Sequence, residues 1–236
     1  MVDFAGIVFR GLTLDDVFAA EPAFAQVVTV NAEYIVLAHE NERLGNIVRR
    51  AITTFDGQVP YTLARLTNKH QRFEKLPGSE LLYHICERAL ARGERVFLLG
   101  GKAESNRGAL EALREKYRGL AVDGWSPPHA PLPFPAEQET FIMHCLESFR
   151  PQYVLVGFGA GKQDFWIDEH REALASLGVK RAVGVGGAFD MVSGKISRAP
   201  RYIQRLGLEG VHRLLKEPKW FRVRRLIISL RFLRYL

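Results

Sequence analysis

The sequence predicts an α/β fold with a mainly parallel sheet, helices on both faces and a basic helical segment at the C-terminal end. Short apolar runs alternate with longer amphipathic runs, which is typical of βαβ units. Glycines follow three of the apolar runs, at 100–101, 157–161 and 186–187. Because parallel strands end at the same edge of a sheet, we expect these glycines to meet there.

The N-terminal part begins with a helix signal. Thr13 and Asp16 have the spacing of a capping box. Residues 26–30 are predicted as a short buried strand. Residues 32–53 are predicted to be mostly helical, in one or two pieces, and residues 56–57 are predicted as a turn.

The rest of the chain alternates between the two kinds of element. Strands are predicted at 95–99, 153–156 and 181–185. Helices are predicted at 77–92, 104–117, 136–149 and 165–177, and again from about residue 203. Residues 123–135 are predicted as a loop, because their five prolines remove amide donors and restrict φ.

Charge is unevenly distributed along the 236 residues, which carry a net charge of +7. Residues 195–236 contain 12 basic and two acidic residues, whereas residues 1–194 carry a net charge of −3. We therefore divide the chain into an α/β body at 1–194 and a basic appendage at 195–236. The hydrophobic content of 47% excludes a disordered chain, and only two cysteines, Cys86 and Cys145, exclude a disulfide framework.

The beginning of the chain shows no apolar run of signal-peptide length. No stretch contains the roughly 20 apolar residues that span a bilayer. We therefore expect a cytoplasmic protein, for which contact with a membrane surface stays open.

The glycines at the predicted strand ends fit two interpretations. They let the backbone approach a phosphate at a helix N-terminus, or they only permit tight turns. Gly157 and Gly159 do not complete a dinucleotide fingerprint, which disfavours a nicotinamide oxidoreductase. Because the sequence contains no Asp-x-Asp pair and no His-Glu-x-x-His motif, it signals no catalytic metal.

Several motifs occur in an order that resembles the WecG/TagA/CpsF family of bacterial glycosyltransferases (glycosyltransferase family 26). The resemblance covers nearly the whole chain, and its most specific part is GVGGAFD at 184–190. The other motifs are TVNAE at 29–33, Asp56-Gly57, LLGG at 98–101, VGFG at 156–159 with KQD at 162–164, RAP at 198–200, GLE at 207–209 and RLLKEP at 213–218.

The resemblance implies an inverting transfer of a sugar from a UDP-sugar to a lipid-linked acceptor. The acceptor would be a sugar on polyprenyl diphosphate, at the inner face of the cell membrane, in the synthesis of teichoic acid or exopolysaccharide. It also implies a Rossmann-like body whose basic appendage completes the site, and an N-acetylmannosaminyltransferase-like activity. No metal and no cofactor besides the co-substrate are expected.

The resemblance also indicates the site residues. Asp56 occupies the family's catalytic Asp-Gly position and is the expected base, although Asp-Gly also makes an ordinary turn. Thr29 is expected to be a catalytic residue together with Asp56. Thr29 and Asn31 would bind the donor sugar or its phosphates. Asn31 equally suits a helix cap. Further substrate-binding residues are expected to be Gly100, Gly101, Gly157, Gly159, Gln163, Asp164, Gly186, Gly187, Asp190, Arg198 and Arg213.

Some of these residues have a second interpretation. Gln163 and Asp164 would meet ribose or sugar hydroxyls, or simply start a surface helix. Asp190 would fix its own loop or hold uridine. Arg213 would stabilise charge on the leaving diphosphate, as would Arg198.

The sequence departs from the family pattern at several positions. Lys75 stands where Arg is usual and Glu80 where Asp is usual, and the loop 159–164 lacks the usual Pro and Glu. Trp220 stands in place of an Arg. These departures leave an alternative function, in which the chain is a catalytically silent paralogue that scaffolds a polysaccharide assembly complex.

The tail at 222–236 is rich in arginine and apolar residues. If it forms a helix, its arginines do not share one polar face. They could reach anionic lipid headgroups while apolar side chains are buried, or the tail packs on the body. Nothing beyond charge favours nucleic acid, and a homo-oligomer stays open. The membrane-facing residues are expected to be Arg222, Arg224, Arg225, Arg231 and Arg234.

Overall fold

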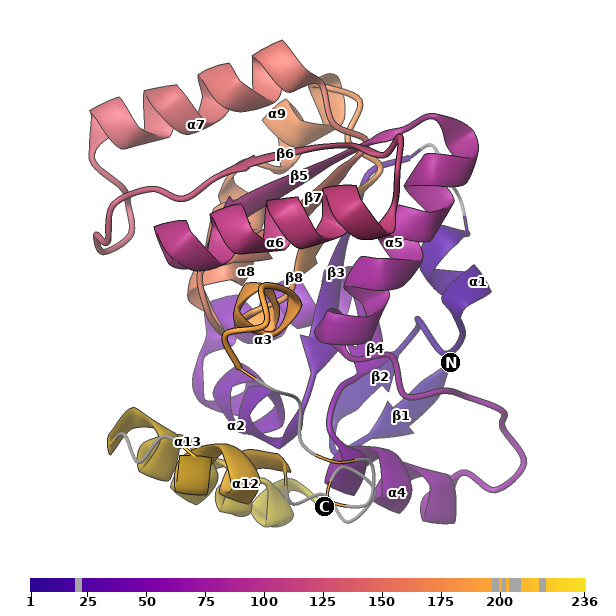
Figure 1. Ribbon diagram of the computed structural model, residues 1–236. Helices are drawn as coiled ribbons and strands as arrows, with labels where there is room; N and C mark the ends of the chain where they lie inside the picture. Colours follow the sequence, from indigo (N-terminus) through magenta and orange to yellow (C-terminus); the bar gives the residue numbers. More distant parts are fainter. Residues whose placement is uncertain (20–22, 197–199, 201–202, 204–208, 217–219) are drawn as a thin grey trace. The chain divides into compact units, whose positions relative to one another are not determined.

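The computed structural model describes residues 1–19, 23–196, 200, 203, 209–216 and 220–236. It is an α/β protein with one six-stranded sheet in the order β4-β3-β8-β7-β5-β6, which confirms the predicted fold class (Figure 1). The chain divides into two compact units. Unit 1 comprises residues 1–19, 28–77 and 198–236, and unit 2 comprises residues 20–27 and 78–197. Strand β3 (Ala25–Val30) contributes its two halves to different units.

Unit 2 holds the parallel strands whose ends carry glycine. Strand β7 pairs with β5 on one side and β8 on the other, so that Gly100 lies opposite Gly157. The carboxyl ends of these three strands are therefore neighbours, as predicted. The strands of this unit are β5 (Arg95–Gly100), β6 (Ala121–Trp125), β7 (Tyr153–Gly157) and β8 (Arg181–Gly184).

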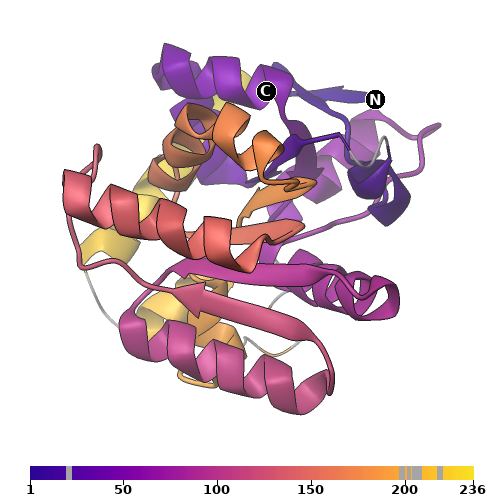
Figure 2. The ribbon, with the colours of Figure 1, turned by 90° about the horizontal axis from the view of Figure 1, so that it is seen from above.

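Helices cover both faces of these strands, and Figure 2 shows α6 and α7 on opposite sides of β5 and β6. One core joins α7 and α8 to the sheet, with Trp166 fully buried against Val154 and Val156. The helices on that side are α7 (Ala136–Phe149), α8 (Lys162–Glu169) and α9 (Arg171–Ser176). The others are α5 (Gly78–Arg92), α6 (Ala103–Lys116) and α10 (Ala188–Val192).

Unit 1 is built around strand β4 and a stack of aromatic rings. The Phe9 and Phe55 rings stack with centroids 3.7 Å apart, and the Phe73 ring also stacks on Phe55, at 5.0 Å. The elements before the tail are β1 (Val2–Phe4), β2 (Ile7–Phe9), α1 (Leu14–Phe18), α2 (Ala32–Glu40), α3 (Glu42–Arg50), β4 (Ile52–Phe55) and α4 (Gln58–Thr67).

The C-terminal segment of unit 1 is helical, as predicted, and contains α12 (Glu209–Lys216), α13 (Trp220–Leu230) and the 3₁₀ helix η1 (Arg231–Tyr235). Helix α13 lies along α2 (Figure 1). Phe232 is buried, the Tyr235 ring stacks on His39 at 4.1 Å, and Arg231 forms an ion pair with Glu40. This side of the segment therefore packs on its own unit.

Several predicted elements match the structure closely. The Thr13 capping box is present, because Asp16 N–H donates to Thr13 and the Asp16 carboxylate accepts from Thr13 N–H. The helix expected at 32–53 is indeed two pieces, since Asn41 caps the start of α3 by accepting a hydrogen bond from Leu44 N at 3.0 Å. Helix α7 has the predicted bounds.

Other predicted elements were wrong. Residues 52 and 53, expected to be helical, belong to strand β4, because α3 ends at Arg50 and the β-branched residues that follow suit a sheet. Residues 123–125 are strand rather than loop, since Phe97 to Leu99 pair with them. The helix expected at 165–177 begins at Lys162 and is interrupted at His170. The β1–β2 hairpin and helix α4 were not predicted.

None of the helices in the described part of the chain is both long and apolar enough to cross a bilayer. The proposed division at residue 194, between a body and an appendage with separate roles, stays a prediction.

Candidate functional site

The ends of β3 and β4 bring together the first group of predicted residues, all of them in unit 1. The Asp56 N–H donates to the Val30 carbonyl at 2.9 Å, which holds the end of β4 against the end of β3. A Cβ built on Gly57 would lie only 3.3 Å from the Cβ of Asn31, and Gly57 has a φ of +98°. Only glycine suits this close approach and backbone conformation. We call Thr29, Asn31, Asp56 and Gly57 the strand-end set.

The strand-end set offers a hydroxyl, an amide and a carboxylate at one edge of the sheet. Asn31 caps α2, because its Oδ1 accepts a hydrogen bond from Tyr34 N at 3.1 Å, as the sequence allowed. Thr29 is buried at 6% exposure, whereas Asp56 is half-buried. Asp56 is therefore more accessible to a substrate hydroxyl than Thr29 is.

At three of the predicted glycines in unit 2, an aromatic ring fills the space that a side chain would need. A Cβ on Gly100 would lie 2.6 Å from the Phe158 ring, and one on Gly101 or Gly157 would lie 2.9 Å from the Phe189 ring. These glycines thus make room for side chains of the same unit. This is closer to the packing interpretation than to the phosphate interpretation of the sequence.

Two other glycines are open. Gly159 and Gly186 have φ values of +93° and +52°, and no atom of the described residues lies within 4 Å of a Cβ built on either. A Cβ on Gly187 would meet only Asp190 Oδ2, at 3.9 Å. We call Gly159, Gly186 and Gly187 the open glycine set, because the surrounding side chains leave room for a ligand beside them.

Gln163 and Asp164 are buried beneath these loops. Gln163 Oε1 accepts a hydrogen bond from Gly186 N at 3.1 Å, and a Cβ on Gly184 would collide with the Gln163 side chain. Asp164 Oδ2 accepts from Gly161 N at 3.0 Å, which closes the first turn of α8. With exposures of 2% and 0%, the two side chains shape the loops from within.

Asp190 fixes the turn that follows β8. Its Oδ1 accepts a hydrogen bond from the hydroxyl of the fully buried Ser105, on α6, at 2.5 Å. Its carbonyl accepts from Ile196 N at 3.0 Å and from Ser193 Oγ at 3.2 Å. Helix α6, which follows β5, and helix α10, which follows β8, are therefore joined through one carboxylate.

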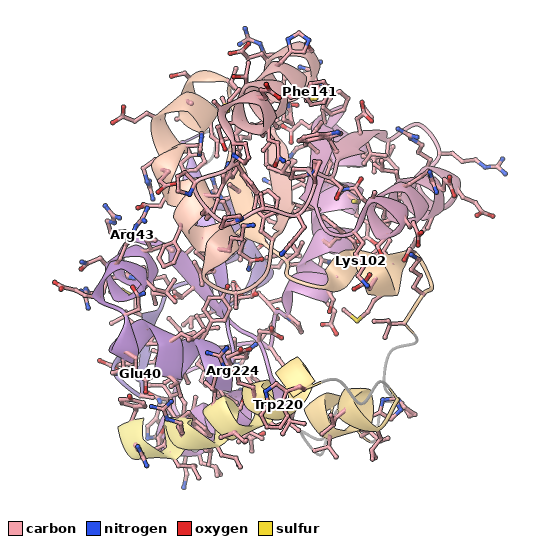
Figure 3. All side chains as sticks on the ribbon, turned by 90° about the vertical axis from the view of Figure 1, so that its left-hand side faces the viewer. Glu40, Arg43, Lys102, Phe141, Trp220 and Arg224 are labelled. Atoms are coloured by element: carbon pink, nitrogen blue, oxygen red, sulfur yellow. The ribbon has the colours of Figure 1, made fainter. Side chains whose placement is uncertain are left out.

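The basic residues are only partly described. Arg198 lies outside the described residues, and so do the side chains of Arg213, Arg222 and Arg225, although their backbone is helical in α12 and α13. Arg224 and Arg234 are exposed, while Arg231 is engaged with Glu40. Figure 3 shows Trp220 at the beginning of α13 and Glu40 near its other end.

No group of three His, Cys, Asp or Glu side chains suited to a metal is found among the residues that the structure describes.

Sequence reasoning missed three polar residues of the two units. Ser105 carries no motif that would reveal its bond to Asp190. Lys162 is bonded to the Ala130 carbonyl and lies over the Phe134 ring at 4.5 Å, where burial lowers the pKa of its ammonium. Gln58 binds Lys75 at 3.0 Å. The signal for Lys162 and Gln58 was their position directly after a glycine turn.

The chain matches a family of known proteins over nearly its whole length. The model of the Glycosyl transferase WecG/TagA/CpsF family matches residues 2–236. The chain is also similar to the N-acetylglucosaminyldiphosphoundecaprenol N-acetyl-beta-D-mannosaminyltransferase of Staphylococcus aureus (strain MRSA252). The two are 28% identical over 200 residues, which cover 85% of this chain and 74% of the relative. The resemblance seen in the sequence is thereby confirmed, and the chain belongs to the WecG/TagA/CpsF family of glycosyl transferases.

Proposed function

We propose that this glycosyltransferase moves a sugar from a UDP-sugar to a sugar carried on polyprenyl diphosphate, with inversion at the anomeric carbon. The observation that carries the proposal is the family match over residues 2–236 together with the relative, whose name specifies a diphosphoundecaprenol-linked acceptor. The same name makes UDP-N-acetylmannosamine the first donor to test. The pathway would be the synthesis of teichoic acid or another cell-surface polysaccharide.

Asp56 is proposed as the general base. Its carboxylate takes the proton of the acceptor hydroxyl while the hydroxyl oxygen forms a bond to the anomeric carbon of the donor. The bond from that carbon to the β-phosphate oxygen breaks, and its electron pair leaves with UDP. The half-buried position of Asp56 at the end of β4, held by the bond to Val30, supports this role. Thr29 and Asn31 would orient the donor from the end of β3.

The open glycine set is proposed to receive the diphosphate of the donor. Negative charge develops on the leaving β-phosphate, and preorganised backbone amides stabilise such charge. The positive φ values and open surroundings of Gly159 and Gly186 support this assignment, and α8 begins directly after the first of these loops. The amides of Gly159 and Gly187 would take the place of a metal ion, since the Gly186 N–H already donates to Gln163 Oε1, and no cofactor is proposed.

The C-terminal segment is proposed to contact the anionic inner face of the cell membrane. Apolar side chains on its outer surface would enter the interface, while Arg224 and Arg234 would meet the headgroups. The exposed apolar side chains of this segment are Val211, Leu215, Trp220, Ile227, Leu230, Leu233 and Leu236. The protein would then act as a peripheral membrane enzyme.

The proposal is tested by measuring UDP release from a panel of UDP-sugars, with a short-chain lipid diphosphate N-acetylglucosamine as acceptor. We expect turnover with one donor, an inverted anomeric configuration in the product, and the same rate after EDTA treatment. Loss of turnover on chelation would contradict the metal-independent mechanism. Binding of UDP without turnover of any donor would instead favour the silent scaffold.

A further inference from the structure

Gln58 and Lys75 form a hydrogen-bonded pair in unit 1. The Lys75 Nζ donates to Gln58 Oε1 at 3.0 Å, and the Gln58 Nε2 donates to Thr62 Oγ1 at 3.0 Å. Because an ammonium can only donate, the amide oxygen must face Lys75, which leaves the amide nitrogen for the Thr62 hydroxyl. The amide is therefore fixed in the orientation that accepts from Lys75.

The backbone that carries Asp56 positions both members of this pair. Lys75 pairs in a parallel bridge with Phe55, the residue before Asp56, and the Leu76 N–H donates to the Phe55 carbonyl at 2.9 Å. Gln58 is the first residue of α4, two residues after Asp56. The backbone of Lys75 is thus held against the end of β4, and its ammonium is held by Gln58.

The partner of Lys75 is neutral. Within the described part of the chain Lys75 makes no ion pair, so its positive charge is held in place without being cancelled. Helix α4 has Gly57 as its N-cap and therefore no side-chain cap, and the positive end of the helix adds to the same field. A lysine stem is flexible, and an exposed ammonium would otherwise move freely in water.

We propose that Gln58 is a positioning residue that holds the Lys75 ammonium at the start of α4, where the ammonium binds a phosphate of a diphosphate substrate. The inference rests on the proposed function, since both the UDP-sugar and the lipid-linked acceptor carry a diphosphate. Lysine lacks the bidentate fork of arginine, and Gln58 supplies the fixed direction that the lysine lacks.

The decisive variant is Gln58→Glu. A glutamate keeps the hydrogen bond to Lys75 and strengthens it, but it neutralises the ammonium. If the pair only supports the fold, Gln58→Glu behaves like the wild type and Gln58→Ala is the more damaging change. If the pair holds charge for a diphosphate, Gln58→Glu is at least as damaging as Gln58→Ala. Gln71→Glu, at an exposed position of the same unit, is the matched control for added negative charge.

The experiment measures KM for donor and acceptor separately, together with direct calorimetric binding of UDP and of a short-chain lipid diphosphate. For Gln58→Glu we expect a rise of about tenfold in KM and Kd for one of these ligands, with an unchanged melting temperature. The ligand whose KM rises identifies the diphosphate that Lys75 meets. In a Lys75→Met background, Gln58→Ala should have no additional effect on that KM.

Two results would overturn the inference: wild-type binding and KM for both ligands in Gln58→Glu, or fully additive effects of Gln58→Ala and Lys75→Met. Both the binding assay and the melting temperature are independent of sugar transfer. If the unmodified protein transfers no sugar, the proposed function fails, but the diphosphate binding of Gln58→Glu still decides the role of this pair.

Discussion

The Oε1 atom of Gln163 lies 3.1 Å from the backbone nitrogen of Gly186 and accepts its hydrogen bond. The bond crosses from the start of α8 to the loop after β8, and it sets the course of a backbone that is otherwise open around Gly186. Ligand binding at this loop should therefore depend on a side chain that is almost fully buried.

We predict that Gln163→Ala weakens UDP binding about tenfold and destabilises the protein by about 1–2 kcal/mol, because the Gly186 N–H loses its acceptor. Calorimetric binding and denaturant unfolding measure the two effects. Gln152→Ala is the matched control, since Gln152 Oε1 accepts from Arg95 N at 2.9 Å before β7, at the amino end of the strands. The control should lose stability and keep UDP affinity. Equal UDP affinity in both variants would remove Gln163 from the site.

Replacing Asp56 by Asn should reduce turnover by at least about 10²-fold and leave UDP affinity close to that of the wild type. The amide keeps the size of the carboxylate but cannot take a proton from the acceptor hydroxyl. The measurement is the rate of UDP release at saturating substrates. Asp15→Asn, on the exposed side of α1 in the same unit, should have no effect. Unimpaired turnover in Asp56→Asn would eliminate Asp56 as the base.

Gly157 provides a test of the ring-packing assignment. An alanine methyl there would meet the Phe189 ring at 2.9 Å and the Gly186 carbonyl at 3.1 Å, so Gly157→Ala should destabilise the protein by about 1–3 kcal/mol through overpacking. Thermal unfolding measures this loss. Phe189→Leu, which removes part of the ring, should recover some stability in the Gly157→Ala background although it destabilises the wild type. Strictly additive losses would argue against the contact.

The junction between α8 and α9 should make stability depend on pH. His170 Nε2 lies 2.7 Å from Glu139 Oε1, and His170 Nδ1 lies 2.9 Å from the Trp166 carbonyl. Burial alone would lower the pKa of His170, but the hydrogen bonds to Glu139 and Trp166 raise it above the usual value of 6.5. Its contribution to stability is therefore complete below pH 6.5 and is lost as the pH rises through the raised folded-state pKa.

Comparison of the wild type with His170→Gln measures this contribution. We expect the wild type to lose about 1 kcal/mol relative to His170→Gln between pH 6 and pH 9. Glu139 acts in the opposite direction at low pH: burial tends to raise its pKa, but the bonds from His170 and Trp166 lower it below 4.5, so its contribution is lost as the pH falls through that lowered value. A difference that does not change with pH would contradict a charged His170.

Membrane contact through the C-terminal segment should be sensitive to charge. The double variant Arg224→Glu with Arg234→Glu should sediment several-fold less with anionic vesicles, because about 1 kcal/mol of attraction is lost for each basic residue at the surface. Neutral vesicles and high salt should remove the difference. Arg107→Glu with Arg118→Glu, two exposed arginines of unit 2, is the matched control. Equal sedimentation of both double variants would contradict a membrane role of this segment.

By itself, the sequence determined the class of fold, because alternating apolar and amphipathic runs leave few arrangements besides a covered parallel sheet. It also located the Asp56-Gly57 turn and the glycine-bearing strand ends, and it indicated the family. Local patterns sufficed there, since each depends on residues close together in the chain. The strand at 52–55 escaped this reasoning, because its apolar and β-branched residues directly continue a helical run.

Only the tertiary structure distinguished the glycines that pack against aromatic rings from those with open surroundings. The Phe158 and Phe189 rings pack directly on Gly100, Gly101 and Gly157, whereas the space beside Gly159 and Gly186 is open. The space around a glycine depends on which distant segment packs on it, and Phe189 comes from helix α10, more than 80 residues after Gly101. Packing also decided which polar side chains brace the loops, because a hydrogen bond such as that of Ser105 to Asp190 leaves no local pattern.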